Sequence, residues 1–363
     1  MKKEDYQISF NVPGFLGDAN QESVWRTPPF KALIQHWWRI VVAQEHDYDW
    51  QKIRESEGRL FGHAWLKDNS GKDWAIRSRV RIKLEHHNKG KLTQWQNAPS
   101  INRVTHPEVK DRNTSQLRPV LPETYLAYGP LHFRDGLVHS PAIEAEEKNQ
   151  LTLIHPKKDA ATFEQVMQLI NGFGTLGGRS RNGWGSLDIQ SNSVEGNHIL
   201  NAEKLLLHSI TRPLSECLKL DWPHAIGTDD QGLLIWQTPE RDNWQLVIKD
   251  LAQTKIKFRT DLPFPNAAPG GFEKRHLLAY PVTNHKIQAW GNTGRLANQI
   301  RFKVAKTSAN KFMGIIVHLP CGLPSEMSQT LCNKAPSIQQ QIETWQQVHN
   351  SLNSQQDLKR IAQ

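Results

Sequence analysis

The sequence is poor in cysteine. Its three cysteines, Cys217, Cys321 and Cys332, include no CxxC pair. An odd number of widely spaced cysteines argues against both a disulfide framework and a structural zinc site. We therefore expect reduced thiols, and neither a metal nor a cofactor.

Long hydrophobic runs are also missing. No apolar stretch reaches the roughly 18 residues that a membrane-spanning helix requires. The first five residues are mostly charged, and no apolar segment of the secretory-signal type follows them. We expect a cytoplasmic protein without a membrane partner.

The charge balance is one-sided. Of the 363 residues, 45 are Lys or Arg and 36 are Asp or Glu, which gives a formal net charge of +9. A basic surface favours polyanionic partners, nucleic acid first. The 13 tryptophans suit either a packed core or base-stacking surfaces, and the length suits about two domains.

One segment has clear helical periodicity. Thr27 suits an N-cap, and Pro28 and Pro29 suit the first turn of a helix. The apolar residues that follow are spaced by three and four, which places them on one face of that helix. They are Phe30, Leu33, Ile34, Trp37, Trp38 and Val41. The similar spacing from Trp244 to Leu251 predicts another amphipathic helix.

Residues 76–84 alternate between uncharged, mostly apolar side chains and basic ones, which predicts a β-strand. The cations on its second face are Arg77, Arg79, Arg81 and Lys83. Adjacent like charges repel one another, so we favour a face that binds a polyanion over a merely solvated face. The alternation of residues 80–84 returns at 300–304, which favours two related α+β halves whose sheets face one ligand.

Three further stretches bear on the domain organisation. Residues 85–141 contain six prolines and little periodicity, which indicates an insertion or extended arm. Residues 190–198 are polar and suit a linker, so we place the division between the halves near residue 195. Residues 336–363 are rich in glutamine with apolar spacers and suit a helical tail.

A glycine-rich stretch spans residues 172–185. Its spacing satisfies GxGxxG, but a dinucleotide-binding loop follows a strand and opens a helix, whereas here the order is reversed. Glycines allow the backbone to approach a ligand closely, and Arg179 and Arg181 supply phosphate donors. Trp184 suits either stacking on a base or packing in the core.

The spacing of Phe163, Val166, Met167 and Ile170 predicts a helix before this stretch, and residues 186–189 suit a strand after it. This helix, the motif FGxxGGRxRxGxG and this strand resemble the glycine-rich signature of the RAMP superfamily of CRISPR proteins. Further motifs resemble the family of first subunits of the Cmr module in type III-B systems. They are Pro13–Gly17, Arg26–Lys31, Trp37–Arg39, Leu60–Gly62 and Ser78–Val80. Asp18 and Ala32 depart from the pattern, which leaves the subtype open.

This resemblance implies a fold and a role. The fold would be α+β with two tandem ferredoxin-like (RRM-like) domains. One would cover residues 1–190 with the insertion 85–141, and the other residues 200–363 with a C-terminal helical tail. The role would be that of an RNA-binding subunit in a type III effector ribonucleoprotein for antiviral defence. Its partners would be the guide RNA, through its 3′ region, target RNA and other RAMP subunits.

The resemblance and the basic strand together nominate RNA-binding residues. The cations are Arg26, Lys31, Arg39, Arg77, Arg79, Arg81, Arg179 and Arg181. The glycines, where the backbone would approach RNA, are Gly17, Gly174, Gly177, Gly178, Gly183 and Gly185. The set contains no metal ligand and no catalytic residue, and residues 271–276 of the second half receive no role.

Two other functions stay open. Some RAMP relatives are metal-independent ribonucleases that process guide RNA with a general-base histidine, and others cut target RNA with an aspartate on an arm. Candidates here are His36, His86, His87, His132, His139 and His276, or Asp111 and Asp135. The other alternative is a protein-only scaffold of the complex. We expect the RNA-binding subunit without catalysis.

Overall fold

The computed structural model describes residues 1–67, 70–95, 103–111, 113–190, 207, 209–264, 270–308 and 310–361. The chain is mixed α+β with several small, mostly antiparallel sheets. Its packing divides it into two units. Unit 1 comprises Met1–Gln96, Ala127–Ile210 and Lys303–Asn310, and unit 2 comprises Asn97–Leu126, Thr211–Phe302 and Lys311–Gln363. Among the described residues, no helix is long and apolar enough to cross a membrane.

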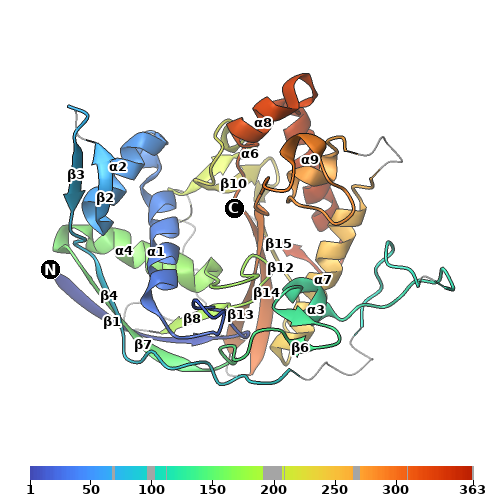
Figure 1. Cartoon of the computed structure of the whole chain (residues 1–363), viewed down its shortest axis with the longest axis horizontal. Helices are drawn as coiled ribbons and strands as arrows, with labels where there is room; N and C mark the ends of the chain where they lie inside the picture. The colour runs from blue at the N-terminus through green and yellow to red at the C-terminus, as the bar shows by residue number, and fades with distance from the viewer. Residues whose placement is uncertain are drawn as a thin grey trace. The chain divides into compact units, whose positions relative to one another are not determined.

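A four-stranded antiparallel sheet forms the centre of unit 1 (Figure 1). Its strands are β1 (Lys2–Phe10), β4 (Arg81–Leu84), β7 (Lys148–His155) and β8 (Leu187–Gln190). The order is β4-β7-β1-β8, and Ile8 lies opposite Asn149 on one side and Ile189 on the other. Because successive side chains of a strand point to opposite faces, Tyr6, Ile8 and Phe10 share one face, and all three are buried.

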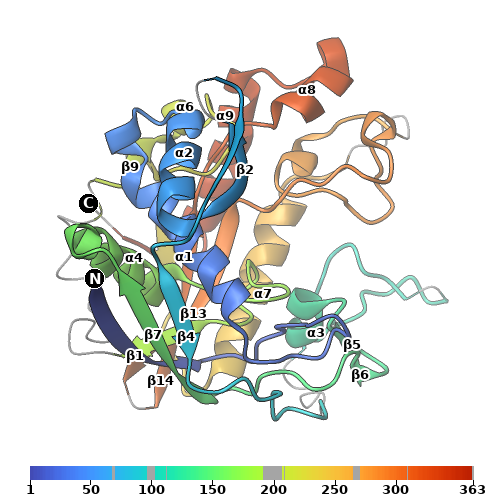
Figure 2. The same ribbon diagram turned by 60° about the vertical axis from the view of Figure 1, so that its left-hand side comes forward.

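Helices α1 (Thr27–Val42) and α4 (Ala160–Phe173) cover this buried face and pack against each other (Figures 1 and 2). The ring centroids of Trp37 and Phe173 are 5.8 Å apart at their contact. The predicted helix is therefore confirmed, although its N-cap is Arg26 and not Thr27, which is the first helical residue. The order β1-α1-β4-β7-α4-β8 is the β-α-β-β-α-β connectivity of a split β-α-β fold.

Shorter elements complete unit 1. They are α2 (Trp50–Phe61), β2 (His63–Lys67), β3 (Asp73–Ile76), β5 (Leu131–His132), β6 (Gly136–Leu137), η1 (Gln44–His46) and η3 (Lys157–Asp159). Helix α2 begins after Asp49, whose side chain accepts a 2.8 Å hydrogen bond from the backbone N–H of Gln51. A carboxylate at this position satisfies an otherwise unbonded N–H of the first turn.

The prediction of one continuous strand over residues 76–84 is wrong. Strand β3 ends at Ile76 and β4 begins at Arg81. Between them, the N–H of Arg79 donates to the carbonyl of Leu60 at the end of α2, at 2.9 Å. The backbone there satisfies the end of a helix rather than a neighbouring strand. The alternation of exposed and less exposed side chains nevertheless continues from 76 to 84.

Unit 2 is built around two sheets. The smaller has the order β11-β10-β9, with β9 (Thr211–Pro213), β10 (Ile226–Asp229) and β11 (Gly232–Leu233). The larger has the order β13-β14-β12-β15, with β12 (Ile235–Gln237), β13 (Ile300–Ser308), β14 (Lys311–His318) and β15 (Lys359–Arg360). The residues of β13 from Lys303 onward belong to unit 1.

Helix α7 (Trp244–Thr260) packs along β14, and α9 (Ile338–Asn353) packs beside α7 (Figure 1). The amphipathic helix predicted from Trp244 is confirmed. The order β12-α7-β13-β14-α9-β15 repeats the connectivity of unit 1. The shorter helices are α3 (Pro122–Ala127), α6 (Leu214–Cys217), α8 (Ser325–Leu331), η5 (Lys274–Leu277), η6 (Gln288–Trp290) and η7 (Cys332–Lys334).

The predictions for the three stretches that bear on domain organisation have different outcomes. The expected division near residue 195 lies outside the described residues, as does the linker apart from Gln190. Residues 85–141 contain α3 and the β5–β6 hairpin, and their described residues are shared between the two units. In the C-terminal stretch, α9 is followed by the short strand β15 rather than by more helix.

Candidate nucleic-acid interface

A run of exposed cations lies on β4, the edge strand of the unit 1 sheet, and in the segment that precedes it. Its members, called here the basic edge, are Arg77, Arg79, Arg81 and Lys83, and all are exposed. Val80 and Leu84, which alternate with them, are 5% and 1% exposed. Within the described part of the chain, no carboxylate forms an ion pair with any of these cations. Their positive charge is therefore available to an outside anion.

The carboxylate of Asp5, which lies on the same face of the sheet as Lys83, is already engaged. Lys83 lies opposite Thr152, and Thr152 lies opposite Asp5. The hydroxyl of Thr152 donates to Asp5 at 2.5 Å, and Lys3 forms an ion pair with it at 2.9 Å. The Thr152 hydrogen bond, and then Lys3, lower the pKa of Asp5. Asp5 therefore forms no ion pair with Arg81 or Lys83.

Two of the predicted RNA contacts, Lys31 and Arg39, have partners inside unit 1. The Lys31 ammonium donates to the carbonyl of Phe61 at 2.8 Å, at the C-terminus of α2. Arg39 forms two hydrogen bonds with the Glu57 carboxylate, of 2.5 and 2.6 Å. Both side chains hold α1 to α2. A phosphate would have to compete with these bonds, and their contact with RNA stays a prediction.

Gly17 and Arg26 come together with the glycine-rich loop. The Arg26 guanidinium donates to the carbonyl of Gly17 at 2.5 Å. The segment just before Gly17 is bonded to the loop, since the N–H of Gly178 donates to Phe15 at 2.8 Å and the N–H of Gly185 donates to Pro13 at 3.0 Å. The structure therefore gathers the predicted residues of both motifs in one place.

The glycines of this loop are required by the chain itself. Gly177, Gly183 and Gly185 have φ values of +95°, +90° and +64°, which residues with a side chain rarely adopt. A Cβ on Gly185 would lie 1.9 Å from the carbonyl oxygen of Leu176, and one on Gly177 would lie 2.6 Å from that of Phe15. The close approach that these glycines permit is an internal one. Their approach to RNA stays a prediction.

Arg179 and Arg181 are exposed on the same loop. Arg179 has a φ of +57°, which turns the chain at this point. Trp184 is fully buried, with its ring centroid 5.1 Å from that of Phe15 and 5.7 Å from that of Trp95. Of the two roles that the sequence left open for Trp184, packing is the one observed.

A buried lysine holds the two ends of the glycine-rich loop. The Lys303 ammonium donates to the carbonyls of Ile170 and Asn171 before the loop, at 3.0 and 2.5 Å, and to that of Leu187 after it, at 2.6 Å. Burial lowers the pKa of Lys303 to about 7, which the Asp188 charge opposes. The expectation that the alternation at 300–304 faces a ligand is therefore wrong for Lys303, because residues 302–305 are buried on both faces of the strand.

Most of the candidate general bases have structural partners. The His276 ring accepts from the N–H of Glu273 and donates to the carbonyl of His285, at 2.9 and 3.0 Å, and is buried. His132 pairs with Asp135 at 2.8 Å. The rings of His86 and His87 lie within hydrogen-bond distance of backbone carbonyls. His36 packs against Trp37, and His139 is exposed.

The Asp111 carboxylate has a local role. It accepts from the backbone N–H groups of Asn113 and Thr114 at 2.9 and 3.0 Å. The bond from Thr114, and then the bond from Asn113, lowers the pKa of the Asp111 carboxyl group. The same two bonds close a turn of the arm. These hydrogen bonds give Asp111 a structural role in the turn.

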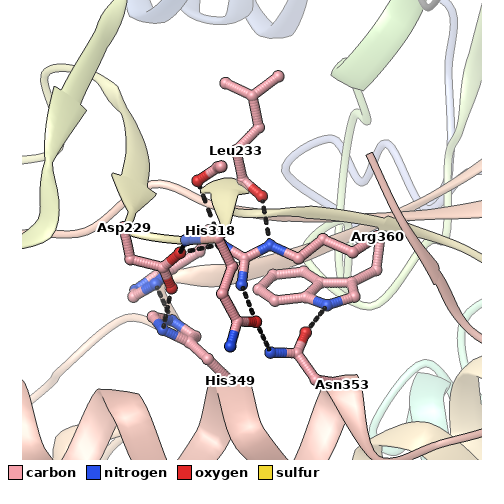
Figure 3. Close-up of polar contacts among 9 residues, drawn as sticks. Asp229, Leu233, His318, His349, Asn353 and Arg360 are labelled. Carbon is pink, nitrogen blue, oxygen red and sulfur yellow. Dashed lines mark hydrogen bonds and ion pairs between the residues drawn. The ribbon is translucent and has the colours of Figure 1, made fainter. Parts of the chain in front are cut away.

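Unit 2 contains a buried polar network that sequence reasoning missed (Figure 3). The Nδ1 of His318 and the Nε2 of His349 are 2.9 Å apart, and Asp229 Oδ2 lies 3.8 Å from the Nδ1 of His349. Arg360 of β15 donates to Asp229 at 2.5 Å. Burial lowers the pKa of His349 to about 3 and also lowers that of His318. Burial thus favours the neutral form of both rings, and the bond from Arg360 to Asp229 holds β15 to the network.

Among the described residues, no group of three His, Cys, Asp or Glu side chains is placed to hold a metal ion. Asn353, which accepts from the indole N–H of Trp236 at 2.7 Å, extends the network toward α9. Its sequence positions are scattered from 229 to 360, so no local pattern could have signalled it.

Comparison with known proteins gives one family. Residues 29–188 match the family described as the RAMP superfamily. This range includes α1 from its third residue onward, the basic edge and the glycine-rich loop. No curated protein matches the sequence.

Several solved structures are similar over much of the chain. The crystal structure of Cmr1 from Pyrococcus furiosus in its apo form has 14% identity and a TM-score of 0.44, over 93% of this chain and 98% of that one. A chain from the type III-B Cmr-beta complex bound to cognate target RNA has 10% identity and a TM-score of 0.46, over 96% and 100%. A chain of a type IV-B CRISPR complex has 13% identity and a TM-score of 0.29, over 54% and 93%.

Proposed function

We propose that this chain, a RAMP superfamily protein over residues 29–188, is a non-catalytic RNA-binding subunit of a type III CRISPR effector ribonucleoprotein. In that assembly it binds the 3′ region of the guide RNA, captures target RNA, or does both, beside other RAMP subunits. The assignment to type III-B rests on the resemblance of the N-terminal motifs to those of the first subunits of the Cmr module. The repeated β-α-β-β-α-β connectivity supports tandem ferredoxin-like domains.

The observation that carries the proposal is the basic edge. Its cations are exposed on an edge strand and in the segment leading to it, and no described carboxylate neutralises them. Such a row suits a phosphate backbone, because each neutralised phosphate releases counterions. Backbone contacts position an RNA without reading its sequence. Sequence would then be read by pairing between guide and target, as in other RNA-guided effectors.

The test compares two variants of equal charge loss. One is Arg77→Ala, Arg79→Ala and Arg81→Ala together. The control is Lys52→Ala, Arg59→Ala and Lys89→Ala together, whose side chains pair with Asp47, Glu55 and Glu22. Binding of labelled single-stranded RNA is followed by gel shift in EDTA across a salt series. The edge variant should lose affinity, and its salt slope should fall by about 2, since each contact with a single strand contributes about 0.7.

Three other results would redirect the proposal. Equal losses in both variants would remove the basic edge as the site and leave only a general charge effect. Discrete cleavage of the RNA in EDTA, abolished by one His→Ala change, would establish the metal-independent ribonuclease. Absence of RNA binding, with salt-insensitive association with partner subunits, would establish the protein-only scaffold.

A further inference from the structure

Two aromatic side chains of unit 1 lie exposed in one short segment. Tyr128 is 62% exposed and Phe133 is 44% exposed. They flank β5 in the β5–β6 hairpin (Figure 2), called here the aromatic hairpin, residues 128–138. Leu131 between them is fully buried, so the hairpin has an inner anchor and an outer aromatic surface.

The hairpin is held in this form by its own contacts. The N–H of Val138 donates to the carbonyl of Pro130 at 2.9 Å. His132 and Asp135 pair across the turn at 2.8 Å. Gly136 has a φ of +67°, and a Cβ there would lie 3.1 Å from the carbonyl oxygen of Trp95. The turn that carries Phe133 is thus fixed, and a ligand that uses the ring does not first have to order it.

Positive charge adjoins both rings. The Arg134 guanidinium lies over the Phe133 ring, 5.2 Å from its centroid. The Arg179 guanidinium from the glycine-rich loop lies beside Gly129, where a Cβ would be 3.2 Å from its Nη2. Gly129 follows Tyr128 directly. Asp135, the acidic residue of the turn, is engaged by His132.

Exposed rings next to cations suit one kind of ligand. Single-stranded nucleic acid offers flat bases for the rings and phosphates for the guanidinium groups. A double helix offers the phosphates but keeps its bases stacked inside. A protein partner would also cover the rings, but the flanking arginines favour a polyanion.

We propose that the aromatic hairpin is a stacking platform for unpaired nucleotides of single-stranded RNA, with Tyr128 and Phe133 against base faces and Arg134 and Arg179 toward the adjoining phosphates. This site rests on the proposed function, since it needs RNA to reach unit 1. It adds to that function a preference for unpaired over paired RNA. The preference is sequence-tolerant, because every base has a face that can stack.

The experiment measures the affinity of the protein for three labelled RNAs. Two are single strands, one a guide-type strand with its 3′ end and the other an unrelated strand. The third is the duplex of the unrelated strand with its complement. The full-length protein is compared with Tyr128→Leu plus Phe133→Leu, which keeps apolar side chains and removes both rings. The control is Trp50→Leu, because Trp50 is a similarly exposed aromatic residue of unit 1, at 53%. Tyr128→Trp plus Phe133→Trp restores stacking surfaces.

The ring-removed variant should lose about tenfold in single-strand affinity for each ring that stacks. Its salt slope and its duplex affinity should not change, since no phosphate contact is removed. The tryptophan variant should recover the wild-type affinity, and Trp50→Leu should bind as wild type. Loss with both single strands is the result expected of a sequence-tolerant platform, and loss with the guide-type strand alone would overturn that tolerance.

Contrary results separate this inference from the proposed function. If the ring-removed variant binds both single strands as wild type while the basic-edge variant loses affinity, the platform is wrong and the RNA-binding function stands. An equal loss for duplex and single strand, or no recovery with tryptophan, also overturns the platform. If the wild-type protein binds none of the RNAs, the proposed function itself fails.

Discussion

Residues 80–84 and 300–304 have the same alternation of basic and apolar side chains, yet their lysines lie in opposite environments. Lys83 is exposed on the edge strand β4. Lys303 is 1% exposed and donates to three backbone carbonyls. Alternation determines which side chains share a face. Whether that face meets water depends on what the rest of the chain packs against it.

The largest effect that this comparison predicts is on stability. Lys303→Met keeps the length of the side chain and removes its three donors, so buried carbonyls lose a partner. Leaving buried polar groups unsatisfied costs about 1 to 3 kcal/mol for each group. We expect the free energy of unfolding to fall by about 3 kcal/mol in urea denaturation.

Lys83→Met is the matched control for that measurement. An exposed substitution away from such contacts changes stability by about 0.5 kcal/mol or less. If the two variants were equally stable, the environments of the two lysines would not differ as the structure indicates.

The second prediction concerns pH. Burial lowers the pKa of Lys303 to about 7, against 10.5 for an unperturbed lysine. Between these pH values the unfolded chain holds a proton that the folded chain has released. The contribution of Lys303 to the free energy of unfolding therefore rises with pH across this window, by at most about 1.4 kcal/mol per pH unit.

Urea titrations at pH 7, 8 and 9 check this slope. The difference between the wild type and Lys303→Met isolates Lys303 from the other groups that titrate in the same range. A difference that stays constant with pH would mean that Lys303 keeps an ordinary pKa in the folded protein.

Local patterns predicted the elements that have one exposed and one buried side. The helix from residue 27 and the helix from Trp244 form where their apolar spacing places them. Alternation also predicted that the cations of the basic edge point to one side, but not that this side is exposed. The strand boundary at residues 77–80 did not, because it depends on a hydrogen bond from Arg79 to Leu60, and nothing in the local sequence specifies that partner.

The glycine-rich loop shows what a sequence pattern cannot predict. Its composition correctly indicated a backbone that needs glycine, but it could not indicate what the backbone approaches. Gly177 and Gly185 are required by the carbonyls of Phe15 and Leu176. Lys303, which holds both ends of the loop, lies more than 100 positions away in the sequence, and only the assembled fold brings it there.

The smallest predicted effect concerns the exposed arginines of the glycine-rich loop, in contrast to the ends of the loop, which Lys303 holds. Arg179→Ala plus Arg181→Ala removes two exposed cations and leaves the bonds of Lys303 in place. We expect RNA affinity to fall about tenfold across unrelated sequences, and the salt slope to fall by about 1.4, since these are backbone contacts. The free energy of unfolding should change by no more than about 0.5 kcal/mol. Gel shifts over a salt series and urea denaturation measure the two quantities. If affinity is unchanged, the glycine-rich loop is not part of the interface, and the basic edge alone supports the RNA-binding function.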